Sequence, residues 1–367
     1  MTRHSSLLRP ELDPLKTYNA GLTLEDAASR CGAKPVAKLA SNENPYPQAP
    51  EVAAAIQRAI ETVHLYPDPH GRRLSARIAS VTGAQADRIV LGNGSEDLLN
   101  VLARCLLRPN DEAVTLYPSF PLHEDYAQMM GAQVTRVGLT AYQQIDIAAL
   151  VEAVARPVRL TLFANPMNPT GLWLSGDQLD RVLAAQHPDS VLCIDEAYLE
   201  YAEGDDYLPL TERLRTHSKP LLTLRTFSKA YGLASLRIGY GISNNAELIR
   251  GMNLVRTPFN VNAVAQAAAL AALEHPQAML SSIKTVRAER ARMMAKFQGM
   301  GLEVMPSKGN FLFVNGRRSA VELADRLITE GVLIKPWKQA GYETWFRVSV
   351  GLKHENDQFL SALAQVI

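Results

Sequence analysis

The stretch TFSKAYGLASLRIGY, residues 226–240, decides the fold, and it follows the apolar run LLTL, 221–224, after one residue, Arg225. A run without polar alternation is typical of a strand buried on both faces of a parallel sheet. Lys229 comes just after this strand, between the hydroxyls of Thr226 and Ser228 and ahead of Arg237. Partial burial and nearby cations favour the neutral amine, which can attack a carbonyl group. The pattern predicts a reactive lysine beside a phosphate site; a surface lysine near an ion-paired arginine is the alternative.

Apolar runs of strand length alternate with helical patterns through the middle of the chain. Such alternation predicts an α/β fold with a mostly parallel central sheet covered by helices. Ligands of these sheets bind beyond the carboxyl ends of the strands, so the loops there should carry the chemistry. The predicted strands are Ile89–Leu91, Ala113–Leu116, Gln133–Val137, Leu160–Phe163, Val191–Ile194, Leu221–Leu224 and Ile238–Ile242.

The last hundred residues have a different pattern, typical of a smaller α+β domain. We expect helices at 283–297 and 320–330 and strands at 310–314 and 346–350. The segment before Pro45 is expected to be irregular and to fold onto this C-terminal part. The predicted large domain is 46–262, and the predicted small domain combines 1–45 with 263–367.

Composition indicates a small-molecule partner. The chain has 367 residues and a formal net charge of +1, so no overall field attracts nucleic acid or a membrane surface. Its three cysteines form no CxxC pair, which argues against a disulfide framework or a zinc site, and Cys193 is expected in the core. The N-terminus lacks the apolar stretch of a signal peptide, which predicts a cytoplasmic location. The Ala-rich run 261–273 is too short for a membrane span and predicts a packed helix.

Asp195 follows the apolar run VLCI, which places a carboxylate at the end of a buried strand. A buried carboxylate needs a partner, and the pyridine nitrogen of pyridoxal 5′-phosphate (PLP) is a suitable one, because the aspartate keeps that nitrogen protonated. Tyr198, three residues later, could reach the phenolic oxygen of the same ring. An aspartate that merely caps the next helix is the alternative.

Two further loops follow predicted strands. NPMNPTG, residues 165–171, forces a sharp turn in which Asn168 could donate to the PLP phenolic oxygen. In LGNGSEDLLNVL the chain turns into a helix whose first turn holds Ser95 and Glu96, and its free N–H groups would seat a phosphate. A dinucleotide fingerprint would need glycine at position 97, where this chain has Asp97, so an NAD dehydrogenase is excluded.

As a set, these motifs resemble those of PLP-dependent class I and II aminotransferases of fold type I, and among them the histidinol-phosphate aminotransferases. The resemblance runs from KLASNENPYP (38–47) to FRVSVG (346–351). It implies that Lys229 binds PLP as a Schiff base, that Asp195 pairs with the pyridine nitrogen, and that Asn168 and Tyr198 reach the phenolic oxygen. The residues implied to hold the cofactor phosphate are Ser95, Glu96, Thr226, Ser228 and Arg237.

The resemblance also implies a partner subunit and a substrate end. Tyr66 matches a tyrosine that the family lends to the neighbouring cofactor phosphate, which implies a homodimer, although a surface Tyr-Pro turn is the alternative. Phe120 stands where the family usually stacks a tyrosine on the pyridine ring. Arg347 matches the arginine that binds the substrate anion, and Lys335 stands where many relatives have arginine. The residues implied to line the approach are Tyr18, Glu43 and Asn44.

The implied reaction is amino transfer from histidinol phosphate to 2-oxoglutarate by a ping-pong sequence. An aromatic amino-acid aminotransferase is the nearest alternative, because its substrates present a flat ring and an anion at similar spacing. A phosphothreonine-type decarboxylase shares the fold and the lysine. A non-catalytic PLP-fold regulator is a further alternative, although such regulators carry an added DNA-binding domain and this chain has no length left for one.

Overall fold

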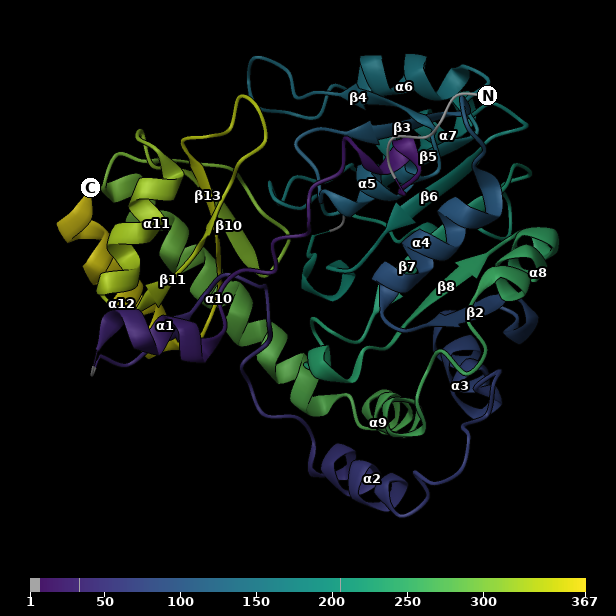
Figure 1. Cartoon of the computed structure of the whole chain (residues 1–367), viewed down its shortest axis with the longest axis horizontal. Coiled ribbons are helices and arrows are strands. Elements are labelled where there is room, and N and C mark those ends of the chain that lie inside the picture. The colour runs from purple at the N-terminus through teal and green to yellow at the C-terminus, as the bar shows by residue number, and fades with distance from the viewer. Residues whose placement is uncertain (1–6, 33, 205) are drawn as a thin grey trace.

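A computed structural model describes residues 7–32, 34–204 and 206–367 (Figure 1). Its centre is a seven-stranded sheet with the strand order β2-β8-β7-β6-β5-β3-β4. Only β8 runs antiparallel to its neighbours in this described sheet, so the other strands end at one shared edge. The predicted strands match within two residues at either end. The observed bounds are β2 Ile89–Gly92, β3 Glu112–Leu116, β4 Gln133–Val137, β5 Leu160–Ala164, β6 Val191–Asp195, β7 Leu221–Thr226 and β8 Gly239–Ser243.

Helices cover both faces of the sheet, which explains why its strands are apolar throughout. Successive residues of β6 enter different cores: Leu192 and Ile194 pack in one, and Val191 and Cys193 in the other. Cys193 is fully buried, as predicted. The first core includes helices α6 (Ile147–Ala155) and α7 (Gly176–Ala185), and the second includes α4 (Ser95–Leu106), α5 (Leu122–Met129) and α8 (Ala246–Val255).

The C-terminal part forms a second sheet, antiparallel, with the order β12-β13-β10-β9. Phe313 of β10 lies opposite Arg347 of β13, and helices α10, α11 and α12 pack beside this sheet (Figure 1). All four predicted elements of this region are present. The bounds are β9 Glu303–Val304, β10 Phe311–Asn315, β12 Lys335–Pro336, β13 Trp345–Ser349, α10 Gln277–Gly299, α11 Ala320–Thr329 and α12 Lys353–Val366.

The segment before Pro45 is not irregular throughout, which corrects the sequence-based expectation. Helix α1 (Leu24–Cys31) begins with a capping box, in which the Thr23 hydroxyl and the Asp26 carboxylate each bind the other's backbone N–H. Its buried Ala27 packs with α11, and strand β1 (Ala37–Lys38) pairs in parallel with β11 (Val332–Leu333). The N-terminal segment therefore does contact the C-terminal part, while the exact domain boundaries stay a prediction.

Three helices lie beyond the edge of the large sheet that β2 forms: α2 (Pro50–Ile60), α3 (Arg72–Thr82) and α9 (Ala263–Glu274) (Figure 1). Helix α9 buries six of its residues, so the Ala-rich run is a packed helix as predicted. Within the described ranges, we find no helix whose length and apolar character would suffice to cross a bilayer.

Candidate active site

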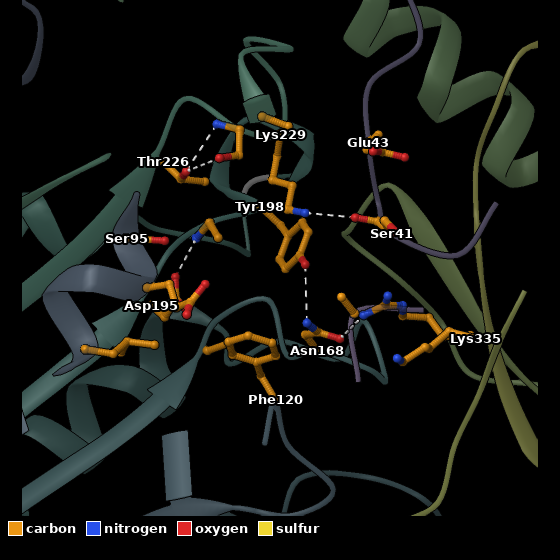
Figure 2. Close-up of a pocket in the computed structure, with 18 of the residues that line it drawn as sticks. Ser41, Glu43, Ser95, Phe120, Asn168, Asp195, Tyr198, Thr226, Lys229 and Lys335 are labelled. Carbon is orange, nitrogen blue, oxygen red and sulfur yellow. Dashed lines mark hydrogen bonds between the residues drawn. The ribbon is translucent and has the colours of Figure 1, made fainter. Parts of the chain in front are cut away.

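A cavity of about 340 Å³ lies at the shared carboxyl edge of the large sheet, where the C-terminal part faces it (Figure 2). The ends of β5, β6 and β7 and the first turn of α4 line it. These segments are distant in sequence, and the parallel sheet brings them together at this edge. All the predicted site residues line it except Asn44 and Tyr66. Those that do are Tyr18, Glu43, Ser95, Glu96, Phe120, Asn168, Asp195, Tyr198, Thr226, Ser228, Lys229, Arg237, Lys335 and Arg347.

Lys229 extends across this cavity, and its Nζ donates a hydrogen bond to the carbonyl oxygen of Ser41 at 3.0 Å. Burial, aided by the positive charge of Arg347, lowers the pKa of Lys229 to about 8. A large fraction of the amine is therefore neutral near pH 8, as a nucleophile or a proton acceptor requires.

Asp195 ends β6 and is held from two sides. One carboxylate oxygen accepts a hydrogen bond from the backbone N–H of Ala197 at 3.1 Å, and the other lies 3.2 Å from Nε2 of His123. His123 comes from α5, is buried, and packs edge-on against the ring of Phe120 with centroids 5.6 Å apart. Sequence reasoning missed His123, because a lone histidine in an apolar setting looks like any core residue. Its contact fixes the direction in which the carboxylate faces the cavity.

Tyr198 and Asn168 form a hydrogen-bonded chain with Arg347. The Tyr198 hydroxyl accepts from the side-chain amides of Asn42 at 3.0 Å and Asn168 at 3.3 Å. Arg347 donates to the Asn168 side-chain oxygen at 2.7 Å and, through its other terminal nitrogen, to the Ala40 carbonyl at 2.7 Å. Burial raises the pKa of Tyr198 to about 12, so its phenol keeps its proton and can donate it to an acceptor in the cavity.

Hydrogen-bond donors converge at the other end of the cavity. Arg237 donates to the Ser228 hydroxyl at 3.3 Å, and the Ser228 N–H donates to the Thr226 hydroxyl at 3.1 Å. Gly94, the N-cap residue of α4, has φ +86° and no side chain to occupy the helix N-terminus. A Cβ on Gly94 would lie 2.5 Å from a terminal nitrogen of Arg237. This arrangement of a guanidinium, hydroxyls and a bare helix N-terminus suits a phosphate.

Two basic side chains, Lys335 and Arg347, line the predicted substrate end of the cavity. Lys335 donates to the Asn19 carbonyl at 2.5 Å, and burial, aided by the charge of Arg347, lowers the pKa of Lys335 to about 8. Arg347 is buried on β13, which lies between two other strands, so it is not a strand-edge charge. The rings of Tyr18 and Phe120 meet edge-to-face with centroids 6.1 Å apart and form an aromatic wall nearby.

The other predicted residues have different surroundings. Glu43 lines the cavity and pairs with Lys38 at 2.7 Å, while Glu96 accepts a hydrogen bond from the Tyr126 hydroxyl at 3.0 Å. Asn44 does not line the cavity: its amide donates to the Ala230 carbonyl at 2.8 Å and to the Ser282 hydroxyl at 3.0 Å, and its place on the substrate approach stays a prediction. Tyr66 is 83% exposed, stacks on Phe259 and lies outside the cavity of its own chain.

The donor set fits PLP group by group. The cavity offers an amine for its aldehyde, a carboxylate for its ring nitrogen, a phenol and an amide for its phenolic oxygen, and the Arg237 cradle for its phosphate. The cradle is the most specific of these features, because a Cβ on Gly94 would displace the guanidinium.

Comparison with known proteins gives concordant similarities. The family profile described as aminotransferase class I and II matches residues 34–363. Histidinol-phosphate aminotransferase 1 of Mesorhizobium japonicum is 48% identical over the whole of both chains. Histidinol-phosphate aminotransferase 3 of Rhizobium meliloti is 47% identical over 98% of this chain and 97% of its own. The crystal structure of histidinol-phosphate aminotransferase from Sinorhizobium meliloti in complex with PLP superposes with a TM-score of 0.89, at 28% identity, covering 98% of this chain and 97% of that one.

Proposed function

Because the chain belongs to the class I and II aminotransferase family, and is thus a PLP-dependent transaminase of fold type I, we propose that its amino donor is histidinol phosphate and its acceptor 2-oxoglutarate. The products would be imidazole acetol phosphate and glutamate, and the reaction would be a step of histidine biosynthesis. The names of the relatives at 47–48% identity support this donor.

The observation that carries the proposal is the pair of cations at one end of the cavity. Lys335 and Arg347 line the same cavity as Lys229, and the charge of Arg347 lowers the pKa of both lysines. A carboxylate needs one cation, whereas a phosphate dianion is bound more tightly by two. The pair therefore favours a phosphorylated donor over phenylalanine or tyrosine, whose only anionic group is a carboxylate.

PLP, when bound, supplies the electron sink that lets the substrate α-carbon lose a proton. Lys229 would hold its aldehyde carbon, Asp195 its ring nitrogen, and Tyr198 with Asn168 its phenolic oxygen. The residues around Arg237 would hold its phosphate, and Phe120 would pack against its ring.

The chain's own residues would then perform the proton transfers. Lys229 Nζ, once displaced by the donor, has a pKa lowered to about 8, so a substantial fraction of it is neutral at physiological pH and can accept the α-carbon proton and return it at the next position. His123 and the Ala197 N–H each contact one oxygen of Asp195 and would keep its carboxylate directed at the ring nitrogen. Tyr198 retains its proton and acts as a donor, not as a base.

A homodimer is part of the proposal. Tyr66 would serve the neighbouring cofactor phosphate, which agrees with its exposure and its place outside its own cavity. Ile60, Val63 and Leu65 are also more than half exposed, and an apolar group of this kind is typical of a protein interface. The cytoplasmic location and the division into 46–262 and 1–45 with 263–367 stay predictions.

A donor panel tests the substrate. Histidinol phosphate, phenylalanine, tyrosine and phosphothreonine should be compared by kcat/KM with 2-oxoglutarate as acceptor. We expect histidinol phosphate to be preferred, and Lys335→Arg to keep or improve that preference because a guanidinium can bind phosphate through two bonds. Arg347→Ala should impair every anionic substrate in both half-reactions. A parental enzyme that prefers phenylalanine refutes the donor, and release of carbon dioxide from phosphothreonine would favour the decarboxylase.

A further inference from the structure

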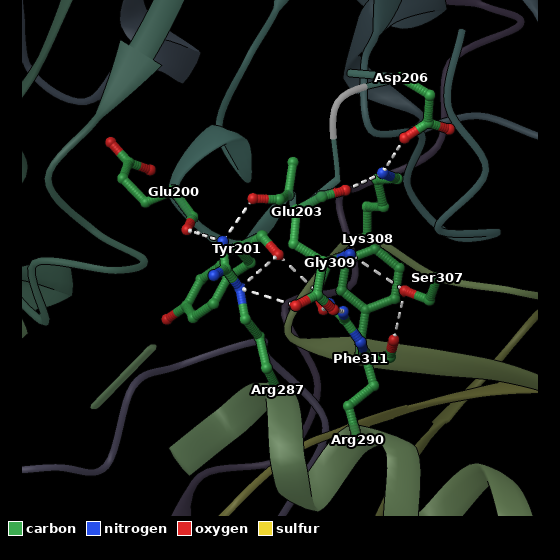
Figure 3. Close-up of polar contacts among 11 residues, drawn as sticks. Glu200, Tyr201, Glu203, Asp206, Arg287, Arg290, Ser307, Lys308, Gly309 and Phe311 are labelled. Atoms are coloured by element: carbon green, nitrogen blue, oxygen red, sulfur yellow. Dashed lines mark hydrogen bonds and ion pairs between the residues drawn. The ribbon is translucent and has the colours of Figure 1, made fainter. Parts of the chain in front are cut away.

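One turn of the small sheet, Ser307–Gly309, touches both loops of the large sheet that carry Asn168 and Tyr198; Figure 3 shows its contacts with the second of these loops. The backbone N–H of Lys308 donates to the Gly171 carbonyl at 3.0 Å, three residues past Asn168. Gly171 has φ +80°, and a Cβ there would lie 2.2 Å from the Ser307 hydroxyl and 2.7 Å from Ser307 Cα, so the turn packs directly on the backbone of this loop.

The side chain of Lys308 binds the other loop. Its Nζ pairs with the Asp206 carboxylate at 2.6 Å, donates to the Glu203 carbonyl, and lies 4.5 Å from the centroid of the Trp173 ring. Trp173 in turn donates to the second Asp206 oxygen at 2.8 Å. The Lys308 side chain is only 7% exposed, so its charge depends on these partners.

The loop that Lys308 binds begins at Tyr198. Residues Leu199–Tyr201 form a 3₁₀ turn, in which the Tyr201 N–H donates to the Tyr198 carbonyl at 3.0 Å. Arg290 of α10 then donates to the Gly309 carbonyl at 2.7 Å and pairs with Glu203 at 2.7 Å. The turn and the loop are thus joined at several points (Figure 3).

We infer that Lys308 is a positioning residue for the transamination reaction, which sets the hydrogen-bonding geometry of Tyr198 and Asn168 by tying their two loops to one turn. The same turn leads into β10, where Phe311 packs edge-on against Tyr198 with centroids 4.9 Å apart. The inference rests on the proposed roles of Tyr198 and Asn168 at the PLP phenolic oxygen, and it does not depend on which donor is used.

The expected signature is a change in acidity at Lys229 in the loaded enzyme. Hydrogen bonds to the phenolic oxygen of PLP withdraw electron density from it. The phenolic oxygen then holds the proton on the linked Lys229 nitrogen less tightly. Loosening Tyr198 and Asn168 should therefore raise the pH at which this nitrogen loses its proton. A hydrogen bond of ordinary net strength corresponds to a rise of about half a unit to one unit.

The test is a pH titration of the cofactor absorbance in purified holoenzyme, with kcat/KM for all active donors measured beside it. Lys308→Met keeps the length of the side chain and removes its charge, and Asp206→Asn weakens the same pair from its more exposed side. Both should raise the pH midpoint and lower kcat/KM by a similar factor for every donor, about 10- to 100-fold for Lys308→Met. Lys308→Arg should restore most of the parental midpoint.

The matched control is Lys353→Met, which breaks an exposed ion pair to Asp357 at 2.7 Å in the same part of the chain and should leave the midpoint unchanged. Tyr198→Phe provides the reference shift, and adding Lys308→Met to it should change the midpoint little further. If Tyr198→Phe shifts the midpoint while Lys308→Met and Asp206→Asn do not, Lys308 has only a structural role and the inference is overturned. If Tyr198→Phe leaves the midpoint unchanged, the proposed role of Tyr198 fails, and the inference fails with it.

Discussion

Replacing Gly94 with alanine should separate the phosphate cradle from the rest of the cofactor site. Gly94 has φ +86° and ψ 163°, a backbone region that is essentially restricted to glycine, so alanine there should cost about 1–3 kcal/mol of folding free energy. Its Cβ would also lie 2.5 Å from a terminal nitrogen of Arg237, which must then move. The guanidinium would lose its alignment with the phosphate.

The magnitude for cofactor binding follows from the charge-assisted hydrogen bond that Arg237 would make. Such a bond contributes about 1.5–3 kcal/mol, so its loss should raise the Kd for PLP by about 10- to 100-fold. The assay is equilibrium titration of the apoenzyme with PLP, together with the Tm of the apoenzyme.

Gly83→Ala is the matched control for backbone strain. Gly83 has φ +71°, ends α3 and has no neighbouring atom within 4 Å of the position of an added Cβ. This variant should also lose stability, though less than Gly94→Ala because other residues can adopt its left-handed backbone, but it should keep the parental Kd for PLP. A Gly94→Ala enzyme that binds PLP with the parental Kd would refute the assignment of this cradle.

Three other predictions address the remaining parts of the site. Asp195→Asn should retain PLP but lose about 10²–10³ in kcat, because a neutral amide cannot keep the ring nitrogen protonated; near-normal kcat would leave Asp195 as a mere cap. Burial lowers the pKa of Lys229 from 10.5 to about 8, so the rate at which apoenzyme takes up PLP should rise with pH and reach half its maximum near pH 8; a midpoint near 10.5 would contradict the depressed pKa. Mixing inactive Lys229→Ala with a Tyr66 variant that retains PLP poorly should restore some activity in heterodimers, and no recovery despite measured subunit exchange would argue against a shared site.

The parts of the site that could be predicted from sequence come from strand ends. Asn168, Asp195 and Lys229 each follow an apolar run, and a parallel sheet brings the ends of such runs together whatever the distance along the chain. Arg237 was predicted because its spacing from Lys229 lies within one motif.

The parts that could not be predicted depend on tertiary placement. Ser41 and Asn42 reach Lys229 and Tyr198 only because the N-terminal segment crosses the cavity after β1 pairs with β11. Asn44, two residues further, packs against Ala230 instead, and no local pattern separates these neighbouring polar residues. His123 likewise lies in the first turn of α5, where nothing in the local pattern marks it as a partner of Asp195.

The central claim is that Lys229 holds PLP covalently and moves the protons of transamination. The most direct measurement is borohydride reduction of the yellow holoenzyme, followed by peptide mapping of the fixed cofactor. The account predicts that the absorbance band is bleached, that the label is on the peptide containing Lys229, and that Lys229→Ala neither fixes the label nor turns over. A label on another lysine, or a Lys229→Ala enzyme with the parental rate, would contradict it.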